Sequence, residues 1–192
     1  DIVLKYSWLH SGDLAQFVWP LKGVTEAVRL SGRVSGTVAE MKGRDINIGY
    51  GLSTRMGFDF DISGLPSFSD SYLHIVFHEM QTRAADIEKV GLPGSKVIKL
   101  PVIAYDLGMI SYEGSFTGFT TDFVSFGTLT TEIGSFSTDL SLRPGGKEMF
   151  NFKGLLKAKN VDLAFITRNS EMFGGLWLHG NVEGSMKSFK HL

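Results

Sequence analysis

Residues 46–62 read INIGYGLSTRMGFDFDI, and this stretch decides the fold class. Every even-numbered position in it except Thr54 is apolar, whereas every odd-numbered position is polar or glycine. A period of two is typical of a β-strand with one face turned away from water. At about 3.3 Å per residue an unbroken strand of this length would exceed roughly 50 Å, so we expect a turn or bend near residues 49–51 or at Gly57.

The same alternation recurs, more loosely, over residues 28–38, 110–116, 136–142 and 150–152. Helical patterns are short by comparison and cover Ser11–Trp19, Ala84–Val90 and Val161–Arg168. The sequence therefore predicts an all-β fold with a few short helices.

Each of the three helical segments contains an aspartate followed by an aliphatic residue, and these aspartates are Asp13, Asp86 and Asp162. An aspartate at a helix start accepts hydrogen bonds from the free amides and suits the positive end of the helix dipole. We interpret all three as structural N-terminal caps or first-turn acids, because nothing pairs them with a second acid or a histidine.

Composition excludes several classes of function. The 192 residues contain no cysteine, which excludes disulfides, a thiol nucleophile and a cysteine zinc site. Lysine and arginine number 19 against 20 acids, so the totals show no nucleic-acid footprint. The chain begins in a strand pattern without a basic and then apolar leader, and we expect it to be a window of a longer protein whose signal or anchor lies outside.

An internal repeat follows from the spacing of the three aspartates, which lie 73 and 76 residues apart. The stretch LSTRMGFDFDIS from Leu52 aligns with LTTEIGSFSTDLS from Leu129, with six identities in twelve positions and one gap. We predict one continuous repeat-built segment with units at residues 13–85 and 86–161 and a partial third unit at 162–192. The extra residue between Gly134 and Phe136 predicts a β-bulge.

The alternation divides the side chains between two faces of the sheet. We expect a strongly curved, antiparallel-rich sheet that forms an elongated, β-taco-like trough with a hydrophobic concave face. The opposite face would carry Arg33, Asp45, Asn47, Arg55, Asp59 and Asp61. The residues expected to line the groove are Val34, Val38, Ile46, Ile48, Tyr50, Leu52, Met56, Phe58, Phe60, Ile62, Phe116, Phe126, Ile133, Phe136 and Leu140. Periodicity alone leaves open whether this row is an open groove or an ordinary core closed by a second layer.

The stretch YEGSFTGFTTDFVSFGTLTTEIGSFSTDLSL at residues 112–142, preceded by LPVIAYDLG at 100–108, resembles the internal repeats of the TamB-like translocation and assembly module family of Bacteroidetes, within the AsmA-like superfamily. The segment SGRVSGTVAEMKGRDINIGYGLSTRMGFDFDISGLP at residues 31–66 is similar to the same repeat. The resemblance covers essentially the whole chain and rests on glycine and alternation patterns.

This resemblance implies a large periplasmic protein, tethered in the inner membrane by an N-terminal helix outside this chain. Its repeated β units would form a hydrophobic groove used in outer-membrane biogenesis, for passage of phospholipid or of unfolded outer-membrane protein strands between the membranes. A TamA-type outer-membrane assembly protein would be the partner, bound through regions outside this chain. No cofactor is implied.

Enzymatic readings are weaker. His74 and His78 lie in a β-branched and aromatic segment, and on a strand they would be about 13 Å apart, too far to share a metal. Asp59 and Asp61 would lie about 7 Å apart on one face, a spacing that a glycosidase could use, but the alternation places them on the charged face with Arg55. We therefore expect no catalytic residue and no metal site.

Two other functions remain open from the residues. The tryptophans Trp8, Trp19 and Trp177 permit a β-rich carbohydrate-binding or adhesive module with aromatic platforms, although phenylalanine predominates here and alternates with branched aliphatics. A purely structural spacer is the third possibility.

Overall fold

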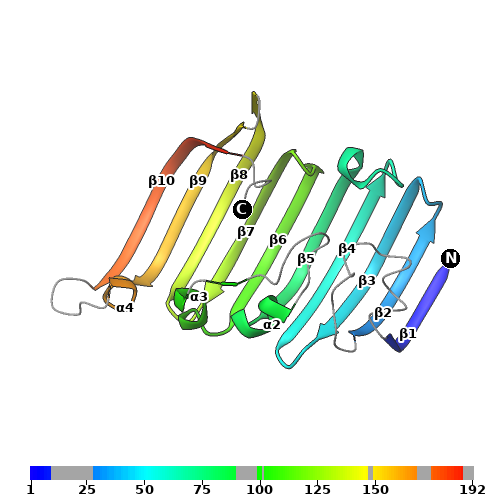
Figure 1. The fold of residues 1–192 in the computed structure, drawn as a ribbon, viewed down its shortest axis with the longest axis horizontal. Helices are drawn as coiled ribbons and strands as arrows, with labels where there is room; N and C mark the ends of the chain where they lie inside the picture. Colours follow the sequence, from blue (N-terminus) through cyan, green and yellow to red (C-terminus); the bar gives the residue numbers. More distant parts are fainter. Residues whose placement is uncertain (10–27, 90–98, 101, 147–148, 168–173, 188–192) are drawn as a thin grey trace.

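The computed structural model describes residues 1–9, 28–89, 99–100, 102–146, 149–167 and 174–187. Its strands form one antiparallel sheet in which each strand pairs with its neighbours in sequence, from β1 to β10 (Figure 1). The end strands do not pair with each other, so the sheet is open. The strands are β1 Ile2–Leu9, β2 Val28–Gly36, β3 Glu40–Tyr50, β4 Thr54–Ser63, β5 Tyr72–Thr82, β6 Ile110–Phe119, β7 Asp122–Thr131, β8 Gly134–Gly146, β9 Met149–Asp162 and β10 Gly175–Lys187. The predicted all-β class with few helices is confirmed.

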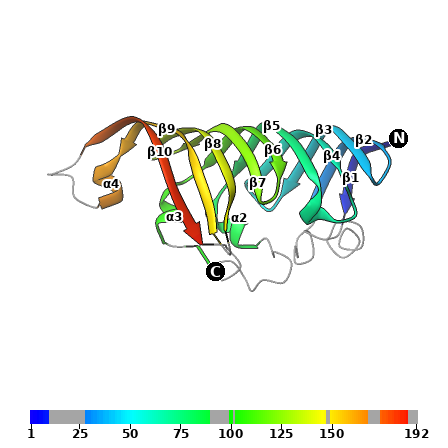
Figure 2. The ribbon, with the colours of Figure 1, turned by 90° about the horizontal axis from the view of Figure 1, so that it is seen from above.

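The helices are short and lie between groups of four strands. After β2–β5 come α2, Ala84–Lys89, and α3, Val102–Asp106; after β6–β9 comes α4, Leu163–Thr167. A short 3-10 helix, η2, covers Phe68–Asp70. Figure 2 shows α2, α3 and α4 on the same side of the sheet. The sequence predicted α2 and α4 but not α3, and the predicted helix at 11–19, with Asp13, lies outside the described residues.

Residues 46–62 form most of a β-hairpin. The pair Tyr50 and Thr54 closes a turn at residues 51–53, which begins within the predicted range, while Gly57 lies inside β4 without a break. Because the turn has an odd number of residues, even-numbered side chains stay on the same face before and after it. This parity explains why the alternation in the sequence runs unbroken through a change of direction.

Bulges are concentrated in the first half of the sheet. In β3, Arg44 and Asp45 together lie opposite Asp59, because Gly43 pairs with Phe60 and Ile46 with Phe58. A second bulge in β5 involves His78 and Glu79. By contrast, the ladders between β6 and β7 and between β7 and β8 have no register shift. The predicted bulge between Gly134 and Phe136 is wrong, since both residues lie in an unshifted ladder.

The repeat alignment does not carry over to structural positions. Gly57 lies in the middle of β4, whereas its aligned partner Gly134 begins β8. Similarly, Leu52 lies in a turn and Leu129 in β7. The order of strands and helices recurs along the chain, but the aligned residues occupy different places in it.

Candidate functional site

On one side of the sheet, three cross-strand rows from β2 to β10 contain no charged residue, and we call this side the apolar face. Directly opposed residues in an antiparallel ladder share a face, so the register assigns each side chain. One cross-strand row runs from β2 to β10 through Leu30, Ile48, Met56, Met80, Tyr112, Leu129, Phe136, Ala158 and Leu178. No charged residue interrupts this row.

Two further rows continue the apolar face. One contains Val34, Gly43, Phe60, Ile75, Phe116, Ser125, Leu140, Gly154 and Val182. The other contains Gly36, Met41, Ile62, Leu73, Gly118, Phe123, Leu142, Phe152 and Gly184. Between the row that starts at Leu30 and the row that starts at Val34, Ile46, Phe58 and Phe77 form a shorter apolar row over β3–β5.

Eleven of the fifteen residues predicted to line the groove share the apolar face. They are Val34, Ile46, Ile48, Tyr50, Met56, Phe58, Phe60, Ile62, Phe116, Phe136 and Leu140. Sequence reasoning missed others, including Phe77, Met80, Tyr112 and Leu129. The alternation of apolar residues could have identified them, but in β5 and β7 apolar residues occur at both odd and even positions, so the pattern does not assign a face.

The other four residues lie elsewhere. Phe126 pairs with Ser115 and Asp139, which puts it on the opposite face with 60% of its surface exposed, so its prediction is wrong. Val38 and Leu52 lie in hairpin turns and are 66% and 92% exposed. Ile133 also lies in a turn, but it is only 6% exposed. These three residues are outside the strands because each hairpin reverses at their positions.

Aromatic rings form a connected cluster on the apolar face. The ring centroid of Phe58 lies 6.2 Å from that of Phe60 and 5.6 Å from that of Phe77. Phe77 is in turn 5.8 Å from Tyr112 in an edge-to-face arrangement. Rings at these separations attract one another beyond simple area burial.

Most side chains of the apolar face are partly exposed rather than buried. Ile46, Tyr50, Leu73 and Ala158 are among its buried strand residues, whereas Ile48, Met56, Phe58, Phe60 and Phe136 are half-buried. Within the described part of the chain there is one sheet only, so no second sheet covers this face.

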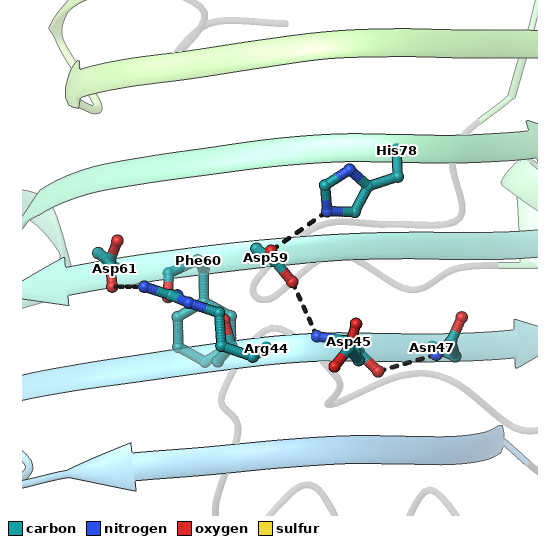
Figure 3. A network of polar contacts seen from close by, with 8 residues as sticks. Arg44, Asp45, Asn47, Asp59, Phe60, Asp61 and His78 are labelled. Atoms are coloured by element: carbon teal, nitrogen blue, oxygen red, sulfur yellow. Dashed lines mark hydrogen bonds and ion pairs between the residues drawn. The ribbon is translucent and has the colours of Figure 1, made fainter.

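The opposite, polar face carries a network around Asp59 (Figure 3). Asp59 Oδ1 accepts a hydrogen bond from the Asp45 amide at 2.8 Å, and Asp59 Oδ2 lies 3.2 Å from His78 Nε2. Arg44 donates to Asp61 at 2.7 Å and to the carbonyl oxygen of Phe60 at 2.8 Å. Both carboxylates are therefore engaged by donors.

This network fixes the ionisation of Asp59. Partial burial alone would raise the pKa of its carboxyl group, but the Asp45 amide, the His78 ring and the Arg44 charge outweigh that effect and lower the pKa below its ordinary value. A glycosidase acid needs a raised pKa instead. Asp59 and Asp61 thus fit a charged structural network better than an acid and base pair.

His74 and His78 both lie on the polar face and contact different partners. His74 Nδ1 is 2.8 Å from Thr117 Oγ1, while His78 contacts Asp59. Among the residues with described positions, no group of three or more His, Cys, Asp or Glu is arranged to hold a metal ion.

The remaining predicted acids differ in role. Asp162 Oδ1 accepts the Phe165 amide at 2.9 Å at the start of α4, as an N-cap does. Asp86 lies in the first turn of α2, as one of the two predicted roles requires, but it does not cap this helix, since α2 begins at Ala84. Its carboxylate instead binds the turn between β3 and β4 and accepts from Ser53 and Leu52 amides and from the Thr54 hydroxyl.

The chain matches no family model, no curated protein and no solved structure. None of the helices within the described ranges is long and apolar enough to cross a membrane.

Proposed function

We propose that the apolar face is the floor of an open groove for lipid, in a repeat-built segment of an inner-membrane-tethered periplasmic protein of the TamB-like type. The cargo is phospholipid acyl chains or, with the same apolar chemistry, an unfolded outer-membrane protein strand. The observation that carries this proposal is the uncharged row from Leu30 to Leu178, together with the absence of a covering sheet in the described part.

The length of this row suits an acyl chain. Nine strands are joined by eight spacings of about 4.8 Å, which makes the row about 38 Å long. That exceeds the roughly 15 Å depth of one bilayer leaflet's hydrocarbon. An acyl chain lying across the strands would therefore stay in contact with apolar side chains over its whole length and over several positions.

The energetic reason is the hydrophobic effect. Each methylene kept from water stabilises the bound chain by about 0.8 kcal/mol. A row of Leu, Ile, Met and Phe side chains offers similar contacts at each step, so no single position holds the chain strongly. Such a surface favours sliding along the groove, and no catalytic residue is needed.

Curvature would turn the flat face into a trough. Bulges bend sheets, and glycines in strands permit close backbone approach. The bulges at Arg44–Asp45 and His78–Glu79 and the glycines opposite aromatic rings supply both devices. The headgroup would remain in water at the rim. The inner-membrane anchor and the contact with a TamA-type partner belong to regions outside this chain.

Photocrosslinking tests the proposal. A photoreactive amino acid at Met80, in the middle of the row, should capture fluorescent phospholipid from vesicles, and Phe58→Asp or Phe136→Asp should abolish that capture while circular dichroism shows a folded sheet. Phe126→Asp is the matched control, since the same change on the opposite face should leave capture intact.

Two outcomes would overturn the proposal. If the wild-type chain captures no lipid and Phe58→Asp or Phe136→Asp unfolds it, the apolar face is a structural core and the chain acts as a spacer. If glycans rather than lipids bind, and binding survives Phe136→Asp, the carbohydrate-binding alternative replaces it.

A further inference from the structure

Two β-bulges lie on either side of β4 at the same level of the sheet. In β3 the bulge pair is Arg44 and Asp45, and in β5 the extra residue relative to β4 is His78. Each bulge frees backbone groups from the ladder and changes the direction of its strand. The first bulge lies opposite Asp59 and the second opposite the step from Gly57 to Phe58, so the two bulges flank neighbouring residues of β4.

The side chain of Asp59 contacts both extra residues at once. One carboxylate oxygen accepts the Asp45 amide at 2.8 Å and the other lies 3.2 Å from His78 Nε2 (Figure 3). Asp45 has a left-handed backbone with φ of 53°, which is costly for a non-glycine residue. Its carbonyl also accepts a hydrogen bond from Asn47 Nδ2 at 2.8 Å.

Arg44 donates hydrogen bonds to backbone and carboxylate acceptors beside the first bulge. Its guanidinium donates to the carbonyl oxygens of Gly43 at 2.7 Å and Phe60 at 2.8 Å, and to Asp61. The other charged groups near the second bulge are Glu79 on the same strand and Glu113, which lies opposite it on β6. Charge on the polar face is thus arranged around the two bulges.

The aromatic cluster lies directly behind this network. Phe58 and Phe60 flank Asp59 in sequence, and Phe77 precedes His78, so their side chains point to the apolar face. The Phe58 ring is 6.2 Å from Phe60 and 5.6 Å from Phe77. A shift of the backbone at either bulge therefore moves a ring of this cluster.

We propose that Asp59 joins the two bulges into one conformational unit, through which the polar face sets the spacing of the Phe58, Phe60 and Phe77 rings on the apolar face. Asp59 is a positioning residue in this unit. The inference concerns the sheet itself and does not depend on what the apolar face binds.

Amide hydrogen exchange by NMR on the 192-residue chain tests this coupling. Asp59→Ala should speed exchange of the Asp45 amide about tenfold, the fold-change expected for loss of one charge-assisted hydrogen bond, and should also speed exchange at Glu79 and Met80 and shift the Phe77 ring resonances. His78→Ala is the decisive variant: it should speed exchange at Asp45, two strands away, by about threefold.

Asp139→Ala is the matched control, because Asp139 lies on the same face where the pairing with both neighbouring strands is regular, and it should change none of these readouts. If Asp59→Ala impairs folding, Asp59→Asn can replace it. This variant keeps an oxygen for the Asp45 amide and should speed exchange at the same amides by smaller factors. The proposal is overturned if His78→Ala leaves exchange at Asp45 unchanged, or if an Asp59 variant alters only one of the two strands.

Discussion

The carboxylate of Asp86 lies 2.7 Å from the amide nitrogen of Ser53, although 33 residues separate them. Asp86 is only 3% exposed, and its second and third partners are Leu52 and Thr54 of the same turn. A helix that follows β5 thereby holds the hairpin turn between β3 and β4. The contact links one end of the four-strand group to its middle.

Removing this carboxylate should destabilise the fold. Asp86→Ala leaves the Ser53 amide and the Thr54 hydroxyl without their buried acceptor, and we expect a loss of about 2–3 kcal/mol in the free energy of unfolding, measured by urea denaturation. Asp86→Asn keeps one acceptor oxygen and should cost less. Asp139→Ala, at an exposed site, should change stability by less than about 0.5 kcal/mol. Equal losses for Asp86→Ala and Asp139→Ala would contradict the assignment.

Low pH should lower the free energy of unfolding through protonation of Asp59 and Asp86. For both, burial raises the pKa but hydrogen bonds outweigh it, so the folded-state pKa lies below the ordinary 3.8. Their contribution to stability is then fully present above 3.8 and is lost as the pH falls through the folded-state pKa. Unfolding free energies measured at a series of pH values should decline less steeply at the acid end for Asp59→Asn and Asp86→Asn than for the wild type. Parallel curves for all three proteins would refute this.

A glycine and an aromatic ring are matched across β3 and β4. A Cβ added to Gly43 would lie 2.1 Å from a ring carbon of Phe60, so the ring occupies the space that a side chain would need. Gly43→Val should therefore displace the ring and lower stability by about 1–3 kcal/mol, measured by thermal or urea unfolding. Combining Gly43→Val with Phe60→Ala should relieve part of the clash, so the double variant should lose less stability than the sum of the two single variants. Purely additive losses of stability would argue against this contact.

The two faces should tolerate polar substitution differently. Phe126 is on the polar face and largely exposed, so Phe126→Ser should leave the unfolding free energy within about 0.5 kcal/mol. Phe58 contacts two other rings, and Phe58→Ser should cost about 2–4 kcal/mol. Urea denaturation of the two variants side by side distinguishes the faces, and similar losses at both sites would mean that the face assignment of Phe126 is incorrect.

Local pattern was enough to predict the all-β class, and eleven of the fifteen residues expected to line the groove lie on one side of the sheet. It failed at Phe126 because β7 is apolar in both phases, with Phe123 on one face and Phe126 on the other, and only the register with β6 and β8 decides between them. The bulges did leave a signal. Apolar positions change from odd at Met41 to even at Ile46, which is the phase shift that one extra residue produces.

Long-range contacts were beyond such reasoning. The bond from Asp86 to Ser53 and the contact between His78 and Asp59 join residues whose local sequence gives no sign of the other. The helix α3 was missed for a different reason, since it has no acid in its first turn and no capping aspartate of the kind that marked α4, which is equally short.

The strand order also bears on how the chain acquires its structure. Every strand pairs only with the strands before and after it in sequence, so each ladder can form as soon as two consecutive strands exist. Proteins rich in such short-range pairings pay little loop-closure entropy and fold faster than sandwiches with crossed connections. A sheet of this kind can grow in the order of its synthesis, with each completed hairpin serving as the template for the next strand.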